Sequence, residues 1–338
     1  MNAELAVYLT QFALSLLLAP LLPGIINRVK AKFAGRHGKP VLQTYYDIAK
    51  LLGKGEVISR TSTWIFAAAP AIALAGTVCA LALLPLGGAV SPLAFAGDFV
   101  LAAYLLGVGR FAVMLGALDT GSAFEGMGAS RESYRGRCRA SIQGSAFEGM
   151  GASREATFSA LAEPVFFLAL MVLTSLCLGL GHGTDTAFSL STMFGGQTAG
   201  AWLTGKGELL LLPVIFFVLL LVENCRIPVD DPNTHLELTM IHEVMVLDHS
   251  GPNLAMILYG AALKLWFFAA LIAGLITPAL PLWEQLGVRL GIVLLLAVVV
   301  GIVESIMARL RMERVPYLLG AAAAMGMLTL ILTQARLP

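Results

Sequence analysis

The chain has 338 residues, of which 58% are hydrophobic and only 13% are charged, and its mean hydropathy is +0.83. This composition excludes an ordinary soluble domain and places the chain among polytopic membrane proteins. The formal net charge of +1 gives no indication of a nucleic-acid partner.

The apolar segments predict an all-α membrane protein with about eight spanning helices, most of them near the ~20 residues that cross a bilayer. We treat residues 1–338 as a single membrane domain. The first apolar segment follows Glu4 and has no basic residues before it, so we expect a retained helix and not a cleaved signal peptide. The predicted spans are Leu5–Ile26, Thr63–Leu86, Leu93–Leu118, Ala156–Leu180, Glu208–Val222, Pro252–Ile276, Val288–Met307 and Pro316–Leu332.

Lysine and arginine are distributed unequally between the two sides of this arrangement. The loops after the first, third, fifth and seventh helices hold 17 of the 22 basic residues. By the positive-inside rule these loops, at about 27–62, 119–155, 223–251 and 308–315, face the cytoplasm. We therefore expect a multi-pass protein of the cytoplasmic (inner) membrane with both termini outside.

The first cytoplasmic loop contains apolar residues at helical spacing between Val41 and Leu52. This pattern predicts an amphipathic helix at the membrane surface. The lysines and arginines of the same loop would equally suit a simple anchor to anionic membrane lipid, and the sequence leaves both interpretations open.

The next cytoplasmic loop contains a perfect internal repeat. Gly121–Glu132 recurs without change at Gly144–Glu155, 23 residues further on. Solenoid repeats need at least three units, so this pair indicates a local duplication or an error in the gene sequence. The residues between the copies are basic and lack a hydrophobic pattern, which predicts a flexible connection.

Five charged residues lie more than two positions inside the predicted helices, and we consider them candidates for a proton relay. A charge at mid-bilayer costs ~2.5–3.5 kcal/mol on insertion scales, so retained charges usually serve function. Structural ion pairs or snorkelling near the helix ends are the alternative, and it applies best to the first and last of the set. The candidates are Asp98, Arg110, Glu163, Lys264 and Glu304.

Glu163 and Lys264 are the strongest of these candidates. Glu163 precedes Pro164, which frees backbone carbonyls nearby. A carboxylate buried there would have a raised pKa and a desolvated Lys264 a lowered one, so protons could pass between such groups.

A polar stretch at residues 223–248 separates two apolar segments, and we expect it to be the working part of the chain. A capping box formed by Thr234 and Glu237 predicts a short helix from about His235. Its apolar stripe would comprise Leu236, Met240, Val244 and Leu247. A solvated acidic loop is the alternative interpretation. The stretch holds six carboxylates: Glu223, Asp230, Asp231, Glu237, Glu243 and Asp248.

Metal and cofactor motifs are missing from the sequence. His242-Glu243 does not complete an H-E-x-x-H motif, because Val246 stands where the second histidine would be. The cysteines show no C-x-x-C spacing, and no haem, Rossmann or phosphate-binding glycine motif is present. We expect no metal and no cofactor in this chain, so electrons would run through other chains.

Four motifs resemble one protein family. They are Leu118-Asp-Thr-Gly-Ser122, Gly149-Met-Gly-Ala-Ser-Arg-Glu155, Ala160-Leu-Ala-Glu-Pro164 and the long Arg226–Glu243 segment that includes Ile-Pro-Val-Asp-Asp-Pro-Asn-Thr-His-Leu-Glu. The chain resembles the membrane subunit of group 4 NiFe hydrogenases, of the formate hydrogenlyase subunit 4 and hydrogenase-4 component C type. That subunit is similar to the complex I subunit called NADH dehydrogenase subunit 1.

The resemblance implies a subunit without a catalytic centre of its own that docks a peripheral hydrogenase module and couples it to proton movement. Its implied partners are the NiFe large and small subunits, antiporter-like membrane subunits and membrane lipid, with the NiFe centre and iron–sulfur clusters in partner chains. The resemblance makes the polar stretch at 223–248 a docking loop, and the implied docking residues are Arg154, Glu223, Arg226, Pro228, Asp230, Asp231, Glu237 and Glu243.

The family has one copy of the loop, with Gly-Gly-Met-Gly where this chain has Glu125-Gly-Met-Gly and Glu148-Gly-Met-Gly. One 23-residue unit is therefore extra, and Cys138 occurs only within it. Two other functions remain open: a quinone-site subunit of a complex I-type enzyme, and a secondary transporter. The transporter would require inverted repeats with broken helices in matching halves, which the sequence does not display.

Overall fold

The computed structural model describes residues 3–58, 62–85, 88–119, 146–180, 183–194, 210–230 and 242–335. Within these ranges the protein is helical and contains no strand, which confirms the all-α class. The helices are α1 (Ala3–Leu18), α2 (Leu21–Phe33), α3 (Gln43–Leu52), α4 (Trp64–Leu83), α5 (Asp98–Leu118), α7 (Ala146–Gly179), α8 (Thr184–Ala187), α9 (Leu190–Met193), α11 (Leu211–Glu223), η3 (Glu243–Val246), α12 (Gly251–Ile276), α13 (Leu282–Ile306), η4 (Met312–Arg314) and α14 (Val315–Ala335).

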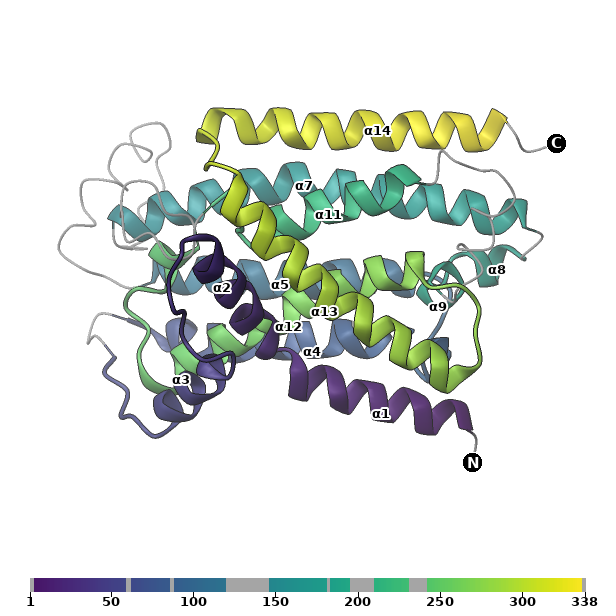
Figure 1. Cartoon of the computed structure of the whole chain (residues 1–338). Coiled ribbons are helices and arrows are strands. Elements are labelled where there is room, and N and C mark those ends of the chain that lie inside the picture. Colours follow the sequence, from purple (N-terminus) through teal and green to yellow (C-terminus); the bar gives the residue numbers. More distant parts are fainter. Residues whose placement is uncertain are drawn as a thin grey trace.

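Six described helices are long and apolar enough to cross a membrane, and the bent pair α1–α2 adds a seventh if it forms one span. The thirteen-residue apolar helix α11 occupies the place of the predicted fifth span. The chain is therefore a multi-pass membrane protein, and the number eight stays a prediction. Both termini lie at one end of the bundle, and α2 and α3 lie at the other (Figure 1).

The first span is broken, so the prediction of one helix over Leu5–Ile26 is wrong. α1 ends at Leu18, α2 begins at Leu21, and their axes differ by 48°. Pro20 immediately precedes α2, and Pro23 lies in its first turn. Proline lacks the amide proton that would continue the ladder of the preceding helix, which explains a break at this place.

Three other spans begin five or more residues away from the predicted position. α5 begins at Asp98 instead of Leu93, α7 at Ala146 instead of Ala156, and α13 at Leu282 instead of Val288. The added turns of α7 and α13 mix charged and polar residues with apolar ones. Hydropathy identifies only the apolar part of a helix, whereas the backbone continues as far as hydrogen bonds allow.

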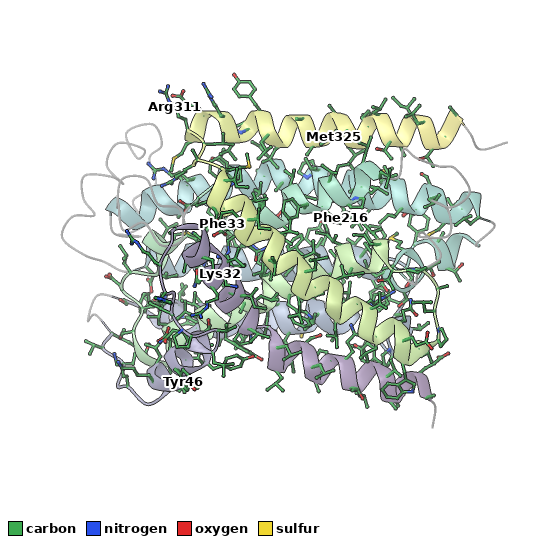
Figure 2. All side chains as sticks on the ribbon, in the orientation of Figure 1. Lys32, Phe33, Tyr46, Phe216, Arg311 and Met325 are labelled. Atoms are coloured by element: carbon green, nitrogen blue, oxygen red, sulfur yellow. The ribbon has the colours of Figure 1, made fainter. Side chains whose placement is uncertain are left out.

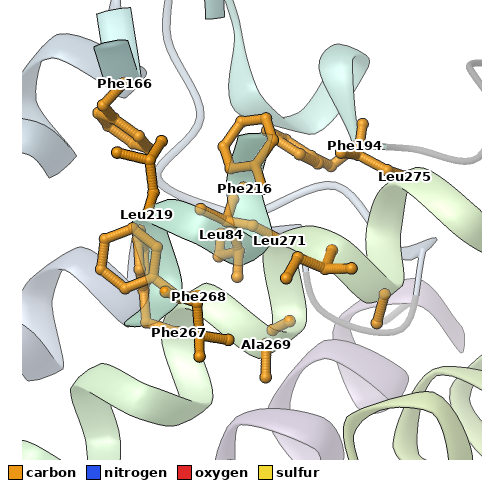
Figure 3. Close-up of a cluster of buried hydrophobic side chains, with 14 of the residues drawn as sticks. Leu84, Phe166, Phe194, Phe216, Leu219, Phe267, Phe268, Ala269, Leu271 and Leu275 are labelled. Atoms are coloured by element: carbon orange, nitrogen blue, oxygen red, sulfur yellow. The ribbon is translucent and has the colours of Figure 1, made fainter. Parts of the chain in front are cut away.

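α12 lies at the centre of the bundle and packs against α3, α4, α11 and α13. A cluster of aromatic side chains joins it to its neighbours (Figure 3). Phe166 of α7 meets Phe216 of α11 and Phe268 of α12, at centroid separations of 6.1 and 6.0 Å with edge-on geometry. This geometry is favourable for aromatic pairs and fixes how the three helices face one another.

α4 and α5 make the most extensive helix–helix contact among the described elements. A Cβ on Gly76 would lie 2.7 Å from the carbonyl oxygen of Leu105, so the backbones approach more closely than a side chain would allow. The same pair is tied at its end, because the Asp119 carboxylate accepts hydrogen bonds from the amide and hydroxyl of Thr63 at 2.7 Å. This pair forms a fixed wall beside the charged residues described next.

Candidate functional site

A chain of ion pairs joins four helices inside the bundle. Arg110 of α5 contacts two carboxylates: its Nη2 lies 2.8 Å from Oε1 of Glu163 on α7, and its Nη1 lies 2.8 Å from Oε1 of Glu223 at the end of α11. Oε2 of Glu223 is 3.0 Å from Nζ of Lys264 on α12. We call Glu163, Arg110, Glu223 and Lys264 the ion-pair chain.

The four members of the ion-pair chain differ in burial. The Glu223 side chain is only 7% exposed, whereas that of Glu163 is 47% exposed. The expectation that Glu163 is a buried carboxylate is therefore wrong, because the side chain reaches out from α7 to meet Arg110. Glu223, which the sequence assigned to the docking loop, is the buried carboxylate that bridges both cations.

A cavity of about 90 Å³ adjoins the ion-pair chain. Its polar wall contains Arg110, Glu223 and Lys264, together with Glu155, Cys225 and His242. Glu155 is buried, and its carboxylate accepts a hydrogen bond from the thiol of Cys225. The rest of the lining is mostly apolar, and a cavity of this size has room for several water molecules beside the polar groups.

Two groups of the cavity wall have pKa values that burial changes. Burial raises the pKa of the Cys225 thiol well above its usual range, and the nearby carboxylates of Glu155 and Asp230 raise it further. Burial lowers the pKa of His242. Both side chains therefore favour their neutral forms at neutral pH, so the fixed charges of the wall are carried by the carboxylates and cations.

A second group of charges lies around Glu304. The buried Glu304 carboxylate is 2.9 Å from Nζ of Lys30 on α2 and 3.5 Å from Nη1 of Arg226, just after α11. The sequence placed Glu304 in the relay and Arg226 in the docking loop. The structure pairs them with each other, so Glu304 does not join the ion-pair chain.

The first part of the docking loop is fastened to the connection between α13 and α14. The carbonyl of Pro228 accepts a hydrogen bond from the amide of Leu310 at 2.8 Å, and Asp230 pairs with Arg309 at 2.7 Å. Arg154 lies within electrostatic range of Asp230 and Arg309. Residues 226–230 therefore form a fixed and largely buried segment next to the cavity.

Asp98 lies apart from the relay candidates. Its carboxylate accepts hydrogen bonds from the Ser189 hydroxyl at 2.9 Å and the Leu190 amide at 2.7 Å. It thereby holds the start of the short helix α9 at the end of the bundle where the termini lie. This contact supports the structural alternative for Asp98, and its relay role stays a prediction.

Arg289 is buried on α13, and sequence analysis did not identify it as a site residue. Its guanidinium donates to the carbonyls of Pro85 and Phe194 at 2.7 and 2.6 Å. Phe194 caps the C-terminal end of α9, where carbonyls lack helical partners. Hydropathy placed Arg289 near a helix end, and no pattern in the sequence predicts which distant carbonyls it would meet.

The remaining docking residues are only partly described. Asp231, Glu237 and the capping box at Thr234 lie outside the described residues, as do the first copy of the repeat and most of the insert.

Glu243 begins a 3-10 helix, Glu243–Val246, where an α-helix was predicted. The predicted apolar stripe is wrong here, because Leu247 is exposed while Met245 and Val246 are buried. The tighter turn brings a different face inward.

Across the described ranges, no group of three or more histidine, cysteine, aspartate or glutamate side chains is arranged to hold a metal ion. The site therefore consists of paired charges beside a small cavity with one polar wall, in a multi-pass helical membrane protein. Paired charges retained inside such a protein are candidates for ion or proton handling.

The chain belongs to the NADH dehydrogenase family, whose profile matches residues 5–136 and 139–334. It is 32% identical to hydrogenase-4 component C of Escherichia coli (strain K12) over 315 residues, covering 89% of each chain. It is 27% identical to formate hydrogenlyase subunit 4 of the same organism over 328 residues, covering 93% of each. These matches confirm the resemblance inferred from the motifs.

Among solved structures, a chain of the membrane-bound sulfane sulfur reductase, an archaeal respiratory membrane complex, has the same fold. The TM-score is 0.73 at 17% identity, with 98% of this chain and 100% of that chain covered. At this identity the match concerns the fold alone.

Proposed function

We propose that this chain is the membrane-anchoring and proton-coupling subunit of an energy-converting NiFe hydrogenase complex such as formate hydrogenlyase. The observation that carries the proposal is the ion-pair chain, which contributes to the polar wall of the cavity. Similarity to hydrogenase-4 component C and to formate hydrogenlyase subunit 4 along most of each chain supports the choice of complex. The chain supplies no catalytic centre in this proposal.

Coupling between the two cations and the proton-binding group would depend on the carboxylate of Glu223, which both cations share. This carboxylate contacts Arg110 and Lys264 together, so a shift of either cation changes the charge balance that the other experiences. Glu163, at the more exposed end, would then take up a proton as Arg110 moves away from it and release the proton as Arg110 returns. Water in the cavity would connect the ion-pair chain to the docking surface.

The docking surface lies close enough to the cavity to transmit such a shift. Arg226 and Cys225 line the cavity, and the fixed residues that follow them lead to Asp230. Residues 227–230 are buried, so a module that docks over this segment would act on the cavity wall through it. We propose that this module contains the NiFe large and small subunits with their NiFe centre and iron–sulfur clusters, and that antiporter-like subunits lie beside the bundle.

The proposed orientation places the docking surface in the cytoplasm and the termini outside the inner membrane. The distribution of basic residues supports it, since 17 of 22 fall in loops on one side. α2, α3 and the start of α14 lie together at the end of the bundle opposite the termini (Figure 1).

The proposal is tested by measuring hydrogen turnover and proton movement together in vesicles that contain the intact complex. Glu163→Gln removes the more exposed carboxylate while keeping its shape. We expect the complex to assemble and the protons moved per hydrogen formed to fall about tenfold or more. The control is Glu284→Gln, which removes an exposed carboxylate from the first turn of α13, outside the ion-pair chain. An unchanged ratio in Glu163→Gln would remove it from the relay.

The perfect repeat offers a second matched pair of variants. Glu155 and Glu132 occupy the same position in the two copies, but it is Glu155 that lines the cavity. Glu155→Gln should lower coupling, whereas Glu132→Gln should leave it unchanged. Glu237→Gln tests the docking loop in the same assay. Equal effects of the two repeat variants would contradict the assignment of Glu155 to the cavity.

A quinone-linked, complex I-type function is the alternative that the family assignment favours. It requires a quinone to contact the cavity wall. Gentle purification through a tag on this chain separates the two proposals. Co-purifying NiFe and iron–sulfur subunits with hydrogen evolution support the hydrogenase, whereas a quinone-reductase activity supports the alternative.

A further inference from the structure

A second pocket, of about 560 Å³, lies away from the ion-pair chain, between the end of α2 and the end of α13. Four of its nine lining residues are basic side chains, and none is acidic. Phe33, beside Lys32 in Figure 2, adds an exposed aromatic ring. The basic lining residues are Lys30, Arg36, His37 and Lys39.

The pocket is built on a fixed turn. The amide of Arg36 donates to the carbonyl of Ala31, and Gly35, with φ of +65°, donates to Lys32. The Arg28 guanidinium then holds the carbonyl of Gly38 at 2.9 Å. The chain after α2 is thereby folded back over the helix, so the basic side chains are presented together before any ligand arrives.

The charge of this pocket is not neutralised from within the described chain. Lys30 is paired with Glu304, which lies next to the lining residue Ser305. No described carboxylate forms an ion pair with Arg36, His37 or Lys39. Two cationic side chains and a histidine therefore face the pocket, and a bound anion would complete it.

The position of the pocket indicates which kind of anion it binds. It lies where two membrane helices end, α2 at Phe33 and α13 at Ile306. The apolar residues at these ends, Phe33, Ile306 and Met307, are exposed by 58%, 70% and 47%. A cationic pocket with an apolar border at the end of spanning helices matches the phosphate and upper acyl chains of a lipid.

We propose that this pocket binds the phosphate headgroup of an anionic phospholipid. Arg36 and Lys39 contact the phosphate, and Phe33 packs against the acyl chains. An acidic surface of a partner protein would satisfy the charges but not the exposed apolar border. The lipid would also cover the Lys30–Glu304 pair, which connects α2 to α13.

The test uses the purified full chain in detergent at about 0.15 M salt, which screens diffuse surface charge. Binding of a fluorescent phosphatidylglycerol is compared with that of the matching phosphatidylcholine. Arg36→Gln with Lys39→Gln removes two pocket charges and leaves Lys30–Glu304 intact. Lys50→Gln with Lys54→Gln removes two exposed charges from the same connection outside the pocket and is the control.

At about 1 kcal/mol per basic residue, we expect the pocket variant to lose roughly thirtyfold in affinity for phosphatidylglycerol. The control should change less than about threefold, and phosphatidylcholine should bind weakly to every variant. Unchanged melting temperatures show that both variants fold. Where the pocket variant itself unfolds, Arg36→Lys with Lys39→Arg keeps the charge and should keep the affinity.

Equal losses in the two variants would indicate diffuse surface attraction and would overturn the proposal, as would no loss in either. Displacement of the lipid by inorganic phosphate at low millimolar concentration would overturn the lipid in favour of a free anion. Loss of co-purifying subunits with unchanged lipid affinity would assign the pocket to a protein partner.

Discussion

Glu223 is the residue on which the ion-pair chain depends, because it is buried and touches both cations. Glu163 touches only Arg110 and is nearly half exposed. Removing one partner of a buried pair leaves an uncompensated charge and costs about 3–5 kcal/mol, whereas an exposed pair contributes about 0–1 kcal/mol.

We therefore predict that Glu223→Gln destabilises the protein more than Glu163→Gln does. The difference should be about 2–4 kcal/mol in the free energy of unfolding. Thermal unfolding of the two variants in the same detergent measures it. Equal melting temperatures would mean that hydration by water, and not the Glu223 carboxylate, stabilises the charges of Arg110 and Lys264.

His249 provides a prediction about pH. It is buried just before α12, with its ring stacked on Phe66 at a centroid distance of 4.0 Å, and burial lowers its pKa to about 4. Below pH 6.5 the unfolded chain binds a proton that the folded protein excludes, so stability falls as the pH falls from 6.5 towards 4. The loss at pH 5 should be about 2 kcal/mol.

His249→Leu removes the contribution of His249 to the pH dependence of stability, even if the variant is also more or less stable than the parent protein at pH 7. The melting temperature of the variant should therefore fall less between pH 7 and pH 5 than that of the parent protein. Identical pH profiles would show that His249 accepts a proton without cost.

At this scale the sequence predicted which residue types matter but not how they pair. Arg110, Glu163 and Lys264 were recognisable because charges are rare in apolar helices. Glu155 was hidden in a repeat that looked like a loop, and Glu223 looked like part of the docking loop. Pairing depends on which helices are neighbours, and local patterns do not contain that information.

Among the elements, the broken span α1–α2 has a feature that no local pattern predicts. The break frees carbonyls at Leu16 and Leu17, and each accepts a hydrogen bond from a tyrosine hydroxyl. Tyr259 of α12 binds Leu16 and Tyr45 of α3 binds Leu17. The surface helix α3 is thereby linked to the bend of the first span, which was predicted as one straight helix.

Removing either hydroxyl should loosen the bend. A net hydrogen bond contributes about 1 kcal/mol, so Tyr45→Phe or Tyr259→Phe should speed amide hydrogen exchange at residues 15–24 about fivefold. Tyr46→Phe is the matched control, because this neighbouring ring is 60% exposed and points away from the bundle. The same acceleration in Tyr46→Phe would show that the effect is not due to the carbonyls of the bend.

Taken as a whole, the protein has two different ends. The end with the termini is closed by buried polar contacts of Asp98 and Arg289. The opposite end carries α2, α3 and the basic pocket at the end of α2. The sequence predicted that the two ends differ, because the lysines and arginines of each loop can be counted without knowing how the helices pack. The closing contacts at the first end join residues about ninety or more positions apart.

The duplicated unit separates α5 from α7 and allows a last prediction about the whole chain. Because the copies are identical, deleting residues 121–143 or residues 133–155 produces the same protein, in which the surviving copy joins directly to Ala156. The survivor therefore supplies the glutamate that lines the cavity. Either deletion gives the same sequence, so it makes no physical difference which copy is called the extra one.

This deletion should stabilise the protein or leave it unchanged. The connection of residues 119–145 would shrink from 27 residues to four. If the connection is as flexible as its sequence predicts, the lower cost of closing it stabilises the fold by about 1–2 kcal/mol. The melting temperature should therefore stay equal or rise, and subunits that co-purify with the parent chain should be retained. A lower melting temperature would mean that the extra unit supports the bundle, and loss of the subunits alone would mean that it contributes to the docking surface.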